Sequence, residues 1–320
     1  MPLRTLPLLG GLLLALAVAP PAVAQSTLRA AGAPVPLNLD GTGFAHPTWS
    51  PDGTQLAFTR PGYDGLWVVQ PDGQALRQIT AESAAGFGFA WSPDGQALLA
   101  RVSQVEGTQR RSAVKVFDLA SGAAEQLTDY RARMPVLPQW SPTGTAVLLP
   151  SPDGLEVLAL ASPGEPQRAV AGPAFVVEGT TLAAVRVGDG GAQTEALLTD
   201  RRVLNAVASP DRARVAFEIM GGDLHVMNAD GSGLRSLGPG HRPTWSPDGQ
   251  WIAFMRTEDD GEAFTASDLF AVRTDGSGET VALTQTADRL EMNPSWSPDG
   301  RTIAFDDLGD GTLYLLPLAR

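Results

Sequence analysis

The feature that most constrains this chain is a pentapeptide, Trp-Ser-Pro-Asp-Gly, which recurs along the sequence. Complete copies begin at Trp49, Trp91, Trp245 and Trp296. A copy with threonine in the aspartate position begins at Trp140, and a weaker one begins at Ala208. A turn that returns at intervals of tens of residues indicates an array of similar structural units.

The chemistry of the pentapeptide predicts a tight turn between two strands. Proline presets φ for the second position of a type I turn, aspartate suits the third, and glycine accepts the left-handed conformation that follows. We therefore assign a structural role to the turn residues Asp52, Asp94, Asp248, Asp299, Gly53, Gly95, Gly144, Gly249 and Gly300. The aromatic residue before each turn is expected to fill the space between neighbouring sheets. These anchors are Trp49, Trp91, Trp140, Phe175, Trp245 and Trp296.

Further turns between the pentapeptides, such as Pro71-Asp72-Gly73, divide each unit into four short strands. A unit of about 40 residues with four strands is typical of a β-propeller blade. The gap between Trp140 and Ala208 holds one more, degenerate copy at residues 175–184. We therefore predict an all-β propeller with seven blades, or six if residues 172–204 are an insertion.

The two ends of the chain are predicted to close the ring. The last blade has strands near residues 302–306 and 313–318, and the chain then ends one strand short. An unassigned strand, Pro34 to Leu39, precedes the first blade. We expect it to supply the missing outer strand, so that no sheet edge is left open. Its prolines suit an edge strand.

The N-terminus has the pattern of a secretory signal. Residues 8–19 are almost wholly apolar, and Ala22-Val23-Ala24 has the form of a cleavage site. We expect a signal peptide at residues 1–24 and one propeller domain at residues 25–320, which predicts a periplasmic or secreted protein. The alternative is a membrane anchor, but the apolar run is too short to span about 30 Å of hydrocarbon. No membrane insertion is expected after cleavage.

Composition limits the classes of molecule that the protein is expected to bind. The formal net charge is −12, which disfavours nucleic acid and anionic lipid surfaces. The chain contains no cysteine, so an exported protein of this sequence must be stable without disulfides. Residues 34–320, with their Trp-Ser-Pro-Asp-Gly hairpins followed by Ile-Ala-Phe, resemble the WD40-like propeller repeats of the TolB family. The resemblance implies the propeller but not the α/β domain that precedes it in that family.

Motifs of catalysis are sparse. The sequence has no Gly-x-Ser-x-Gly elbow, no dinucleotide fingerprint and no phosphate-binding loop. His46 and His241 lie three and four residues before Trp49 and Trp245, where side chains can face a central channel. Zinc ligation by this pair would need carboxylates as well. We interpret them as locally hydrogen-bonded channel or turn residues, and we predict no cofactor.

Two charged regions are candidate binding sites. The acidic residues fall on loops of the last two blades and are possible Ca²⁺ ligands: Asp259, Asp260, Glu262, Asp306, Asp307 and Asp310. The alternative is a solvated acidic cluster. The basic residues are Arg110, Arg111, Arg131 and Arg133, which we call the basic sector. A face divided by charge suits a protein partner that is attracted electrostatically.

These observations favour a non-enzymatic scaffold that binds a protein or an envelope component through its loops. The alternative is a hydrolase or lyase that acts on a saccharide or small ester in the channel, with or without a divalent cation. The fold alone does not separate them. A channel enzyme is expected to gather three or more titratable groups at the channel mouth, and a scaffold is not.

Overall fold

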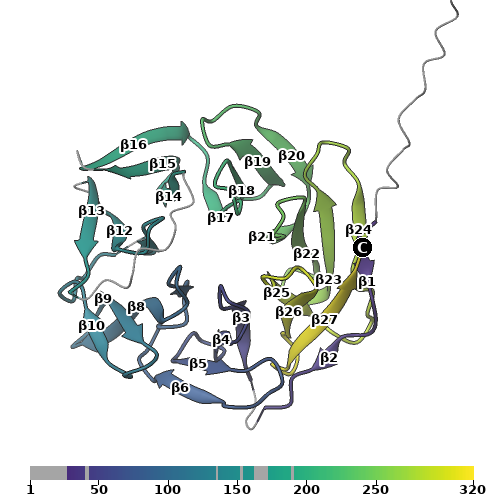
Figure 1. The fold of residues 1–320 in the computed structure, drawn as a ribbon, viewed down its shortest axis with the longest axis horizontal. Helices are drawn as coiled ribbons and strands as arrows, with labels where there is room; N and C mark the ends of the chain where they lie inside the picture. Colours follow the sequence, from purple (N-terminus) through teal and green to yellow (C-terminus); the bar gives the residue numbers. More distant parts are fainter. Residues whose placement is uncertain (1–26, 40–42, 135, 152–153, 162–171, 189–190) are drawn as a thin grey trace, which may run out of the picture.

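The computed structural model describes residues 27–39, 43–134, 136–151, 154–161, 172–188 and 191–320. Within them the chain forms seven antiparallel sheets arranged in a ring (Figure 1). The prediction of a seven-bladed propeller is confirmed. No helix in the described part of the chain has the length and apolar character needed to cross a membrane. The expected signal peptide lies outside the described residues.

Four blades are complete four-stranded sheets. Blade 1 contains β3 (Ala45–Trp49), β4 (Leu56–Thr59), β5 (Leu66–Val69) and β6 (Arg77–Thr80). Blade 2 contains β7 (Ala90–Trp91), β8 (Ala97–Glu106), β9 (Gln109–Asp118) and β10 (Ala124–Gln126). Blade 5 contains β17 (Val203–Ala208), β18 (Arg214–Ile219), β19 (Leu224–Asn228) and β20 (Arg235–Gly238). Blade 6 contains β21 (His241–Trp245), β22 (Trp251–Asp259), β23 (Phe264–Arg273) and β24 (Thr280–Ala282).

The other three blades depart from this pattern. Blade 3 contains β11 (Gln139–Trp140), β12 (Ala146–Ser151) and β13 (Gly154–Ala159) in its described part. Blade 4 contains β14 (Ala174–Glu178), β15 (Thr181–Gly188) and β16 (Gly191–Leu198). Blade 7 contains β25 (Glu291–Trp296), β26 (Thr302–Asp307) and β27 (Leu313–Ala319). The degenerate copy at Phe175 is thus a blade of its own, which excludes the six-bladed alternative.

The recurring pentapeptide forms the turn between the first and second strands of a blade. In blade 1, Ser50 Oγ donates to Asp52 at 2.6 Å and Gly53 N donates to Ser50 O at 2.9 Å. Gly53 has a φ of 73°, a conformation that costs a residue with a Cβ more than it costs glycine. The same serine–aspartate bond recurs in the other copies, at Ser92, Ser209, Ser246 and Ser297. These aspartates are therefore occupied by turn formation.

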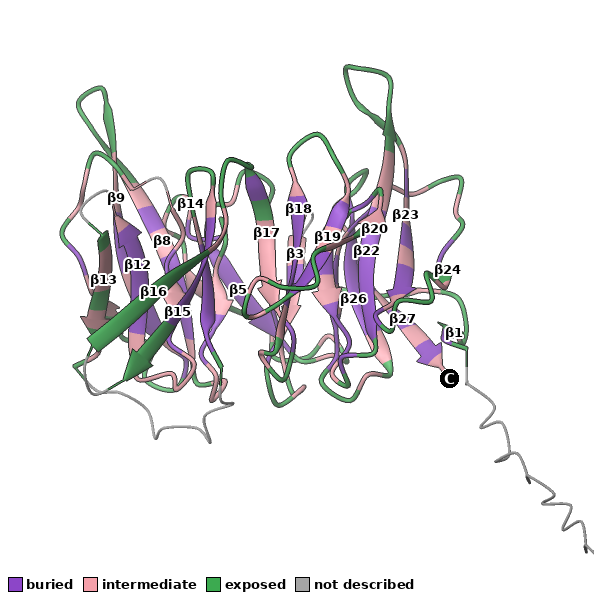
Figure 2. Cartoon of the chain, turned by 90° about the horizontal axis from the view of Figure 1, so that it is seen from above, coloured by how far each residue is buried: buried purple, intermediate pink, exposed green. Residues whose placement is uncertain are grey.

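The anchor tryptophans join one blade to the next. The indole N–H of Trp91 donates to Thr48 O in blade 1 at 3.0 Å, and that of Trp245 donates to Val207 O in blade 5 at 3.1 Å. In these two anchors the indole therefore satisfies its one donor while its ring is buried between two sheets, whereas the indole nitrogens of Trp49 and Trp296 have no partner among the described residues. Figure 2 shows that burial concentrates in the strands and that exposed residues lie in the connections at both ends of the ring.

The ring is closed by the two ends of the chain. β27 pairs antiparallel with β1 (Arg29–Ala30) and with β2 (Val35–Pro36), so that Ala30 lies opposite Leu318 and Val35 opposite Leu315. Leu37 N also donates to Leu313 O at 2.7 Å. The predicted closure by Pro34 to Leu39 is confirmed, and the structure adds Arg29–Ala30, which the sequence analysis did not include. The outer edge of the last blade is thereby covered.

One substitution tests the closing segment. Leu28 has 1% of its surface exposed and packs in the core cluster of blades 6 and 7. Replacing a buried leucine with alanine typically costs about 2–5 kcal/mol. We therefore expect Leu28→Ala to lower the free energy of unfolding by that amount in urea titrations. Val35→Ala, a substitution of a 57% exposed residue in the same segment, is the control and is expected to be nearly neutral. Equal effects of the two would contradict the closure.

Candidate functional site

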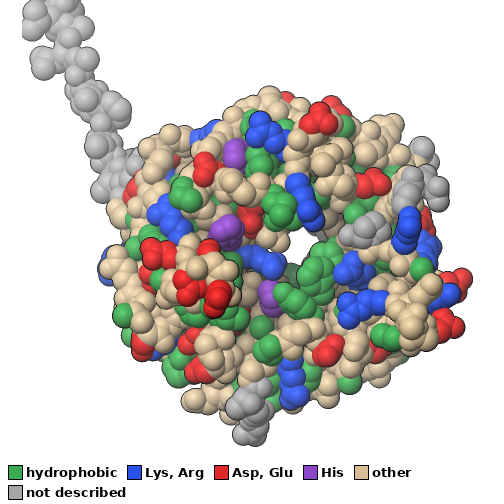
Figure 3. Space-filling view, turned by 180° about the vertical axis from the view of Figure 1, so that it is seen from behind, with side chains coloured by type: hydrophobic (Ala, Val, Ile, Leu, Met, Phe, Trp, Pro, Cys, Tyr) green, Lys and Arg blue, Asp and Glu red, His purple; other side chains and the backbone are tan. Residues whose placement is uncertain are grey.

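The connections of each blade divide between two faces of the ring. Because strands alternate in direction, the turns between first and second strands lie on one face. The connections between second and third strands, and those between blades, lie on the other. We call the latter the loop face. Figure 2 shows its two longest hairpins, β8–β9 and β22–β23, projecting on the same side. Figure 3 shows the ring hollowed at its centre, with basic and histidine side chains near the hollow.

One repeat position lines the central channel. It lies three residues before the anchor residue, and four of its members have positive φ although they are not glycine: His46, Asn205, Arg242 and Asn293. The ladder between first and second strands shifts register at each of these sites. Such a bulge turns the side chain away from the sheet. All four residues line one channel cavity of about 510 Å³.

The polar residues occupy one arc of the channel. Asn205, Arg242, Asn293 and His46 belong to blades 5, 6, 7 and 1, which follow one another around the ring. The corresponding positions in blades 2, 3 and 4 are Gly88, Leu137 and Gly172. The channel therefore has a polar side and a side of glycine and leucine.

Two buried carboxylates fasten this arc in the same way. Glu218 on β18 accepts from the side chain of Asn205 and from Arg242 N, each at 2.6 Å. Asp306 on β26 accepts from the side chain of Asn293 at 2.9 Å and from His46 N at 3.1 Å. Each carboxylate thus joins the asparagine of its own blade to the backbone of the next. Since Asp306 does so across the junction of blades 7 and 1, it reinforces the ring closure.

The pKa values of the two carboxyl groups are shifted in opposite directions. Burial raises the pKa of Asp306 to about 7, because its hydrogen-bond partners are neutral and do not outweigh the lost hydration. Burial acts the same way on Glu218, but hydrogen bonds led by the one from His241 hold its pKa below the usual value. Burial, with a smaller effect of the Arg242 cation, lowers the pKa of His46 to about 4. His46 is therefore neutral at neutral pH.

A cavity of about 570 Å³ opens at the loop-face end of this arc. Its polar wall includes His46, Tyr63, Arg242 and Asp306. Its apolar wall comprises Phe44, Met255, Phe264, Met292 and Leu308. A mostly apolar cavity with a few convergent polar groups is the usual form of a ligand site. These four residues and three further titratable ones, Arg60, Asp307 and Asp310, therefore line the channel mouth, which is the feature expected of a channel enzyme.

The acidic residues considered as calcium ligands do not gather. Asp306 and Asp307 are buried, and Asp307 accepts from Leu290 N at 3.1 Å and Gly309 N at 2.9 Å. Asp260 accepts from Glu262 N and Ala263 N within its own loop. Among the described residues, no three histidine, aspartate or glutamate side chains form a group that could hold a metal ion. Asp260 and Asp307 serve local loop structure, Asp306 joins two blades, and the described residues give calcium binding no geometric support.

The basic sector is only partly available for binding. Arg131 makes a bidentate pair with Glu156, at 2.6 and 2.8 Å, and the Nε of Arg111 lies 3.0 Å from Glu106. Arg133 is exposed. Of the four, Arg110 lines the cavity of about 460 Å³ that also contains Arg101. Arg101 was not among the binding residues predicted from the sequence.

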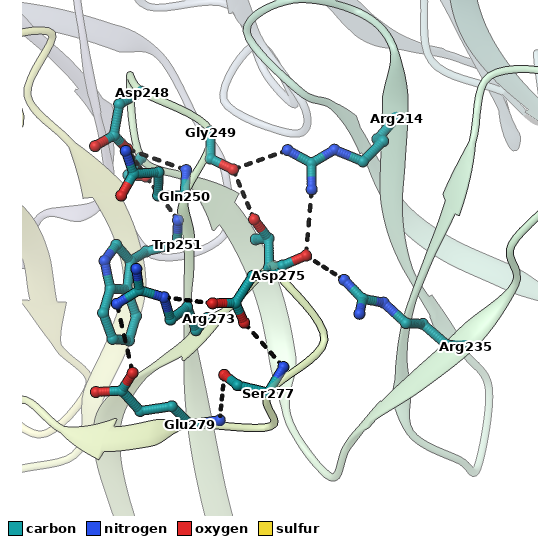
Figure 4. A network of polar contacts seen from close by, with 12 residues as sticks. Arg214, Arg235, Asp248, Gly249, Gln250, Trp251, Arg273, Asp275, Ser277 and Glu279 are labelled. Carbon is teal, nitrogen blue, oxygen red and sulfur yellow. Dashed lines mark hydrogen bonds and ion pairs between the residues drawn. The ribbon is translucent and has the colours of Figure 1, made fainter. Parts of the chain in front are cut away.

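Arginines on the opposite face connect blades 5 and 6 (Figure 4). Arg214 donates to Gly249 O at 2.9 Å and lies over the ring of Trp245, 4.8 Å from its centroid. Arg214 and Arg235 both donate to Thr274 O. Arg273 pairs with Asp275 at 2.7 Å. These arginines already have partners, so this network stabilises the fold and offers little to a ligand.

The sequence contains two signals of the channel residues that were not among the predictions. Glu218 and Asp306 both follow an Ala-Phe pair of the second strand, which is one fixed position of the repeat. Three of the channel residues stand directly before a proline, in His-Pro-Thr-Trp, Arg-Pro-Thr-Trp and Asn-Pro-Ser-Trp. Aligning these positions would have identified Arg242, rather than His241, as the counterpart of His46.

Comparisons with known proteins agree with the fold. TolB from Acinetobacter baumannii is 17% identical, with a TM-score of 0.50 over 86% of this chain and 63% of that chain. An oligogalacturonate lyase in complex with manganese is 16% identical, with a TM-score of 0.49 over 88% of this chain and 79% of that one. An oligogalacturonate lyase from Vibrio parahaemolyticus is 12% identical, with a TM-score of 0.47 over 87% and 78%.

At these identities the likeness concerns the fold alone, and it supports the TolB-like propeller that the repeats predicted. The chain spans less than two thirds of the TolB structure it matches. No protein-family model and no curated protein matches the sequence.

The raised pKa of Asp306 gives a prediction for stability. Between about pH 4 and 7 the unfolded chain ionises this carboxyl while the folded protein keeps its proton, so its stabilising contribution is lost as pH rises through that window. His46 acts with the opposite sign, because its folded pKa is depressed and stability is gained from about pH 4 to 6.5. We expect Asp306→Asn to remove the falling component and His46→Gln to remove the rising one.

The measurement is urea unfolding at a series of pH values from 4 to 8. Asp310→Asn, which changes an exposed aspartate of the same β26–β27 connection, is the control and should retain the wild-type profile. If Asp306→Asn also retained it, the assigned protonation of Asp306 would be wrong.

Proposed function

We propose that this protein is an exported, TolB-like propeller that acts as a non-enzymatic scaffold and binds a protein of the cell envelope through its loop face. The observation that carries the proposal is the distribution of exposed apolar side chains. Most of the large ones lie in loop-face connections or at strand ends beside them: Phe87, Val105, Leu204, Met220, Phe264 and Leu308. Apolar residues grouped on one face, with polar residues between them, are typical of protein-binding surfaces.

Charge supports the same face. The β22–β23 hairpin has an acidic tip, with Glu258, Asp259, Asp260 and Glu262 all exposed. The β8–β9 hairpin carries Arg110 near its tip. The two hairpins rise from the same face but from different parts of the ring (Figures 1 and 2). Such separation of charge orients an approaching protein and raises its association rate.

The hydrogen bonds that the channel carboxylates accept from the protein itself favour a scaffold over an enzyme. Glu218 and Asp306 stand at equivalent repeat positions and bind equivalent partners. Asp306 is 2% exposed, and its oxygens accept hydrogen bonds from the protein itself. A carboxylate that recurs with the repeat and satisfies backbone donors has a structural reason to be present.

The first test compares matched surface variants. Val105→Asp and Leu308→Asp place a charge on exposed apolar residues of the loop face, whereas Leu234→Asp does so between β19 and β20 on the opposite face. We expect the loop-face variants, used as bait against envelope extract, to lose most of the wild-type partners by quantitative mass spectrometry. The Leu234→Asp variant should keep them. Equal recovery by all three variants would refute the loop-face proposal.

A second candidate is a channel-site hydrolase or lyase acting on a saccharide or small ester. It is favoured by the titratable groups that line the 570 Å³ cavity and by the pKa of Asp306 of about 7, which suits a general acid or base. This candidate predicts turnover of nitrophenyl esters or of acidic oligosaccharides that Arg242→Met abolishes. The scaffold proposal predicts no turnover above a buffer blank. Turnover that depended on Arg242 would replace the first proposal by the second.

A further inference from the structure

The inner side of the β8–β9 hairpin carries a polar strip that the function proposed above does not explain. Ser103 lies opposite Ser112, and Arg101 stands two residues before Ser103. Arg110 stands two residues before Ser112 on the partner strand. Because side chains alternate along a strand, these four residues share one side of the hairpin. All four line the cavity of about 460 Å³.

The strip holds two positive charges that are not neutralised. Among the described residues neither Arg101 nor Arg110 has a salt bridge, and no acidic residue lines the cavity. The guanidinium of Arg101 makes one hydrogen bond, from Nη1 to Met134 O at 2.8 Å, and its buried Nε has no described partner. Burial, together with the Arg110 charge, lowers the pKa of Arg101. A bound anion would offset the repulsion between the two guanidinium groups and would stabilise the buried charge of Arg101.

The hydroxyls add a donor at the same place. Ser103 Oγ and Ser112 Oγ lie 2.9 Å apart, so one donates to the other and one O–H hydrogen remains. The side chain of Arg110 has no hydrogen-bond partner among the described residues, so its guanidinium donors are also available. Guanidinium groups with hydroxyl donors are the groups that bind carboxylate, phosphate and sulfate in proteins.

An aromatic wall connects this cavity to the channel mouth. The guanidinium of Arg101 lies 5.2 Å from the ring centroid of Phe87. Phe87 meets Tyr63 edge-on at 5.0 Å, and Tyr63 lies 5.2 Å from His46. Gly62 and Tyr63 line both this cavity and the mouth cavity. A ligand could therefore place an anionic end on the arginines and an apolar part along Tyr63 and Phe87.

We propose that Arg101, Arg110, Ser103 and Ser112 form an oxyanion-binding site, and that its occupant is an acidic side chain of the protein partner, flanked by an aromatic one. The identity of the occupant rests on the proposed function. A protein is favoured because the site lies among exposed Phe87 and Val105 on the loop face. Arg111 and Arg131, which pair with Glu106 and Glu156, do not line the cavity.

The test uses defined probes rather than an unidentified partner. Acetyl-Glu-Phe-Glu-amide is titrated into the full protein and followed by calorimetry, with acetyl-Gln-Phe-Gln-amide as the uncharged probe and inorganic phosphate as the free anion. We expect saturable binding of the acidic peptide alone among the peptides. Arg110→Met should weaken it by about tenfold or more, which corresponds to one lost charge-assisted hydrogen bond. Arg133→Met, a change of an exposed arginine outside the cavity, should leave it unchanged.

Arg110 is exposed, so its variant is expected to fold, and circular dichroism verifies this. Equal binding by wild type and Arg110→Met, or equal binding of the two peptides, would overturn the site. Phosphate binding that requires Arg110, without peptide binding, would overturn the acidic side chain as occupant. Envelope partners lost by Val105→Asp, in the absence of peptide binding, would refute this inference and leave the proposed function intact. Peptide binding without any envelope partner would refute the proposed function and leave the oxyanion-binding site intact.

Discussion

The pairing of β27 with the two N-terminal strands is the interaction on which the structure depends. A propeller blade is a small sheet that buries its faces only against its neighbours, so a gap anywhere in the ring exposes two of those faces. Here β1 and β2 cover the outer edge of the last blade, and Leu28 is buried in its core. The same junction builds the channel mouth, because His46 N donates to Asp306 and Phe44 N donates to Gly311 O across it.

Repetition explains how the channel acquires its chemistry. In blades 1, 5, 6 and 7 the residue three positions before the anchor lies on a bulge and lines the channel, so its identity can change without altering the sheet. Four consecutive blades place polar side chains there, and two of them add a carboxylate, Glu218 or Asp306, that binds the next blade. The groups that make the mouth polar are therefore also groups that stabilise the ring. The cavity beside Arg101 differs, because its arginines have no such structural pairing.

The fold was predictable because its determinants are local. A Trp-Ser-Pro-Asp-Gly turn forms from its own residues, and even the degenerate copy at Phe175 retained enough of the pattern to be counted as a blade. The site was not predictable in the same way. Asp306 binds His46 across 260 residues of sequence, and that contact exists only once the ring is closed. Likewise, the four arginines of the basic sector were grouped by charge alone, yet Glu106 and Glu156 pair with two of them. Arg101 lies within strand β8, and its sequence position did not indicate that it lines a cavity.

The most direct test of the closed ring is a disulfide between the two ends of the chain. The protein has no cysteine, and Val35 lies directly opposite Leu315 in an antiparallel ladder. Opposite residues of such a ladder have Cα atoms about 4.5–5.5 Å apart, which is within the range that a disulfide spans. The account predicts that a Val35→Cys, Leu315→Cys variant oxidises to an intramolecular disulfide, detected by mass spectrometry under native conditions. A Val35→Cys, Leu318→Cys variant, whose cysteines are out of register, should remain reduced. A disulfide in the second variant, or none in the first, would contradict the closed ring.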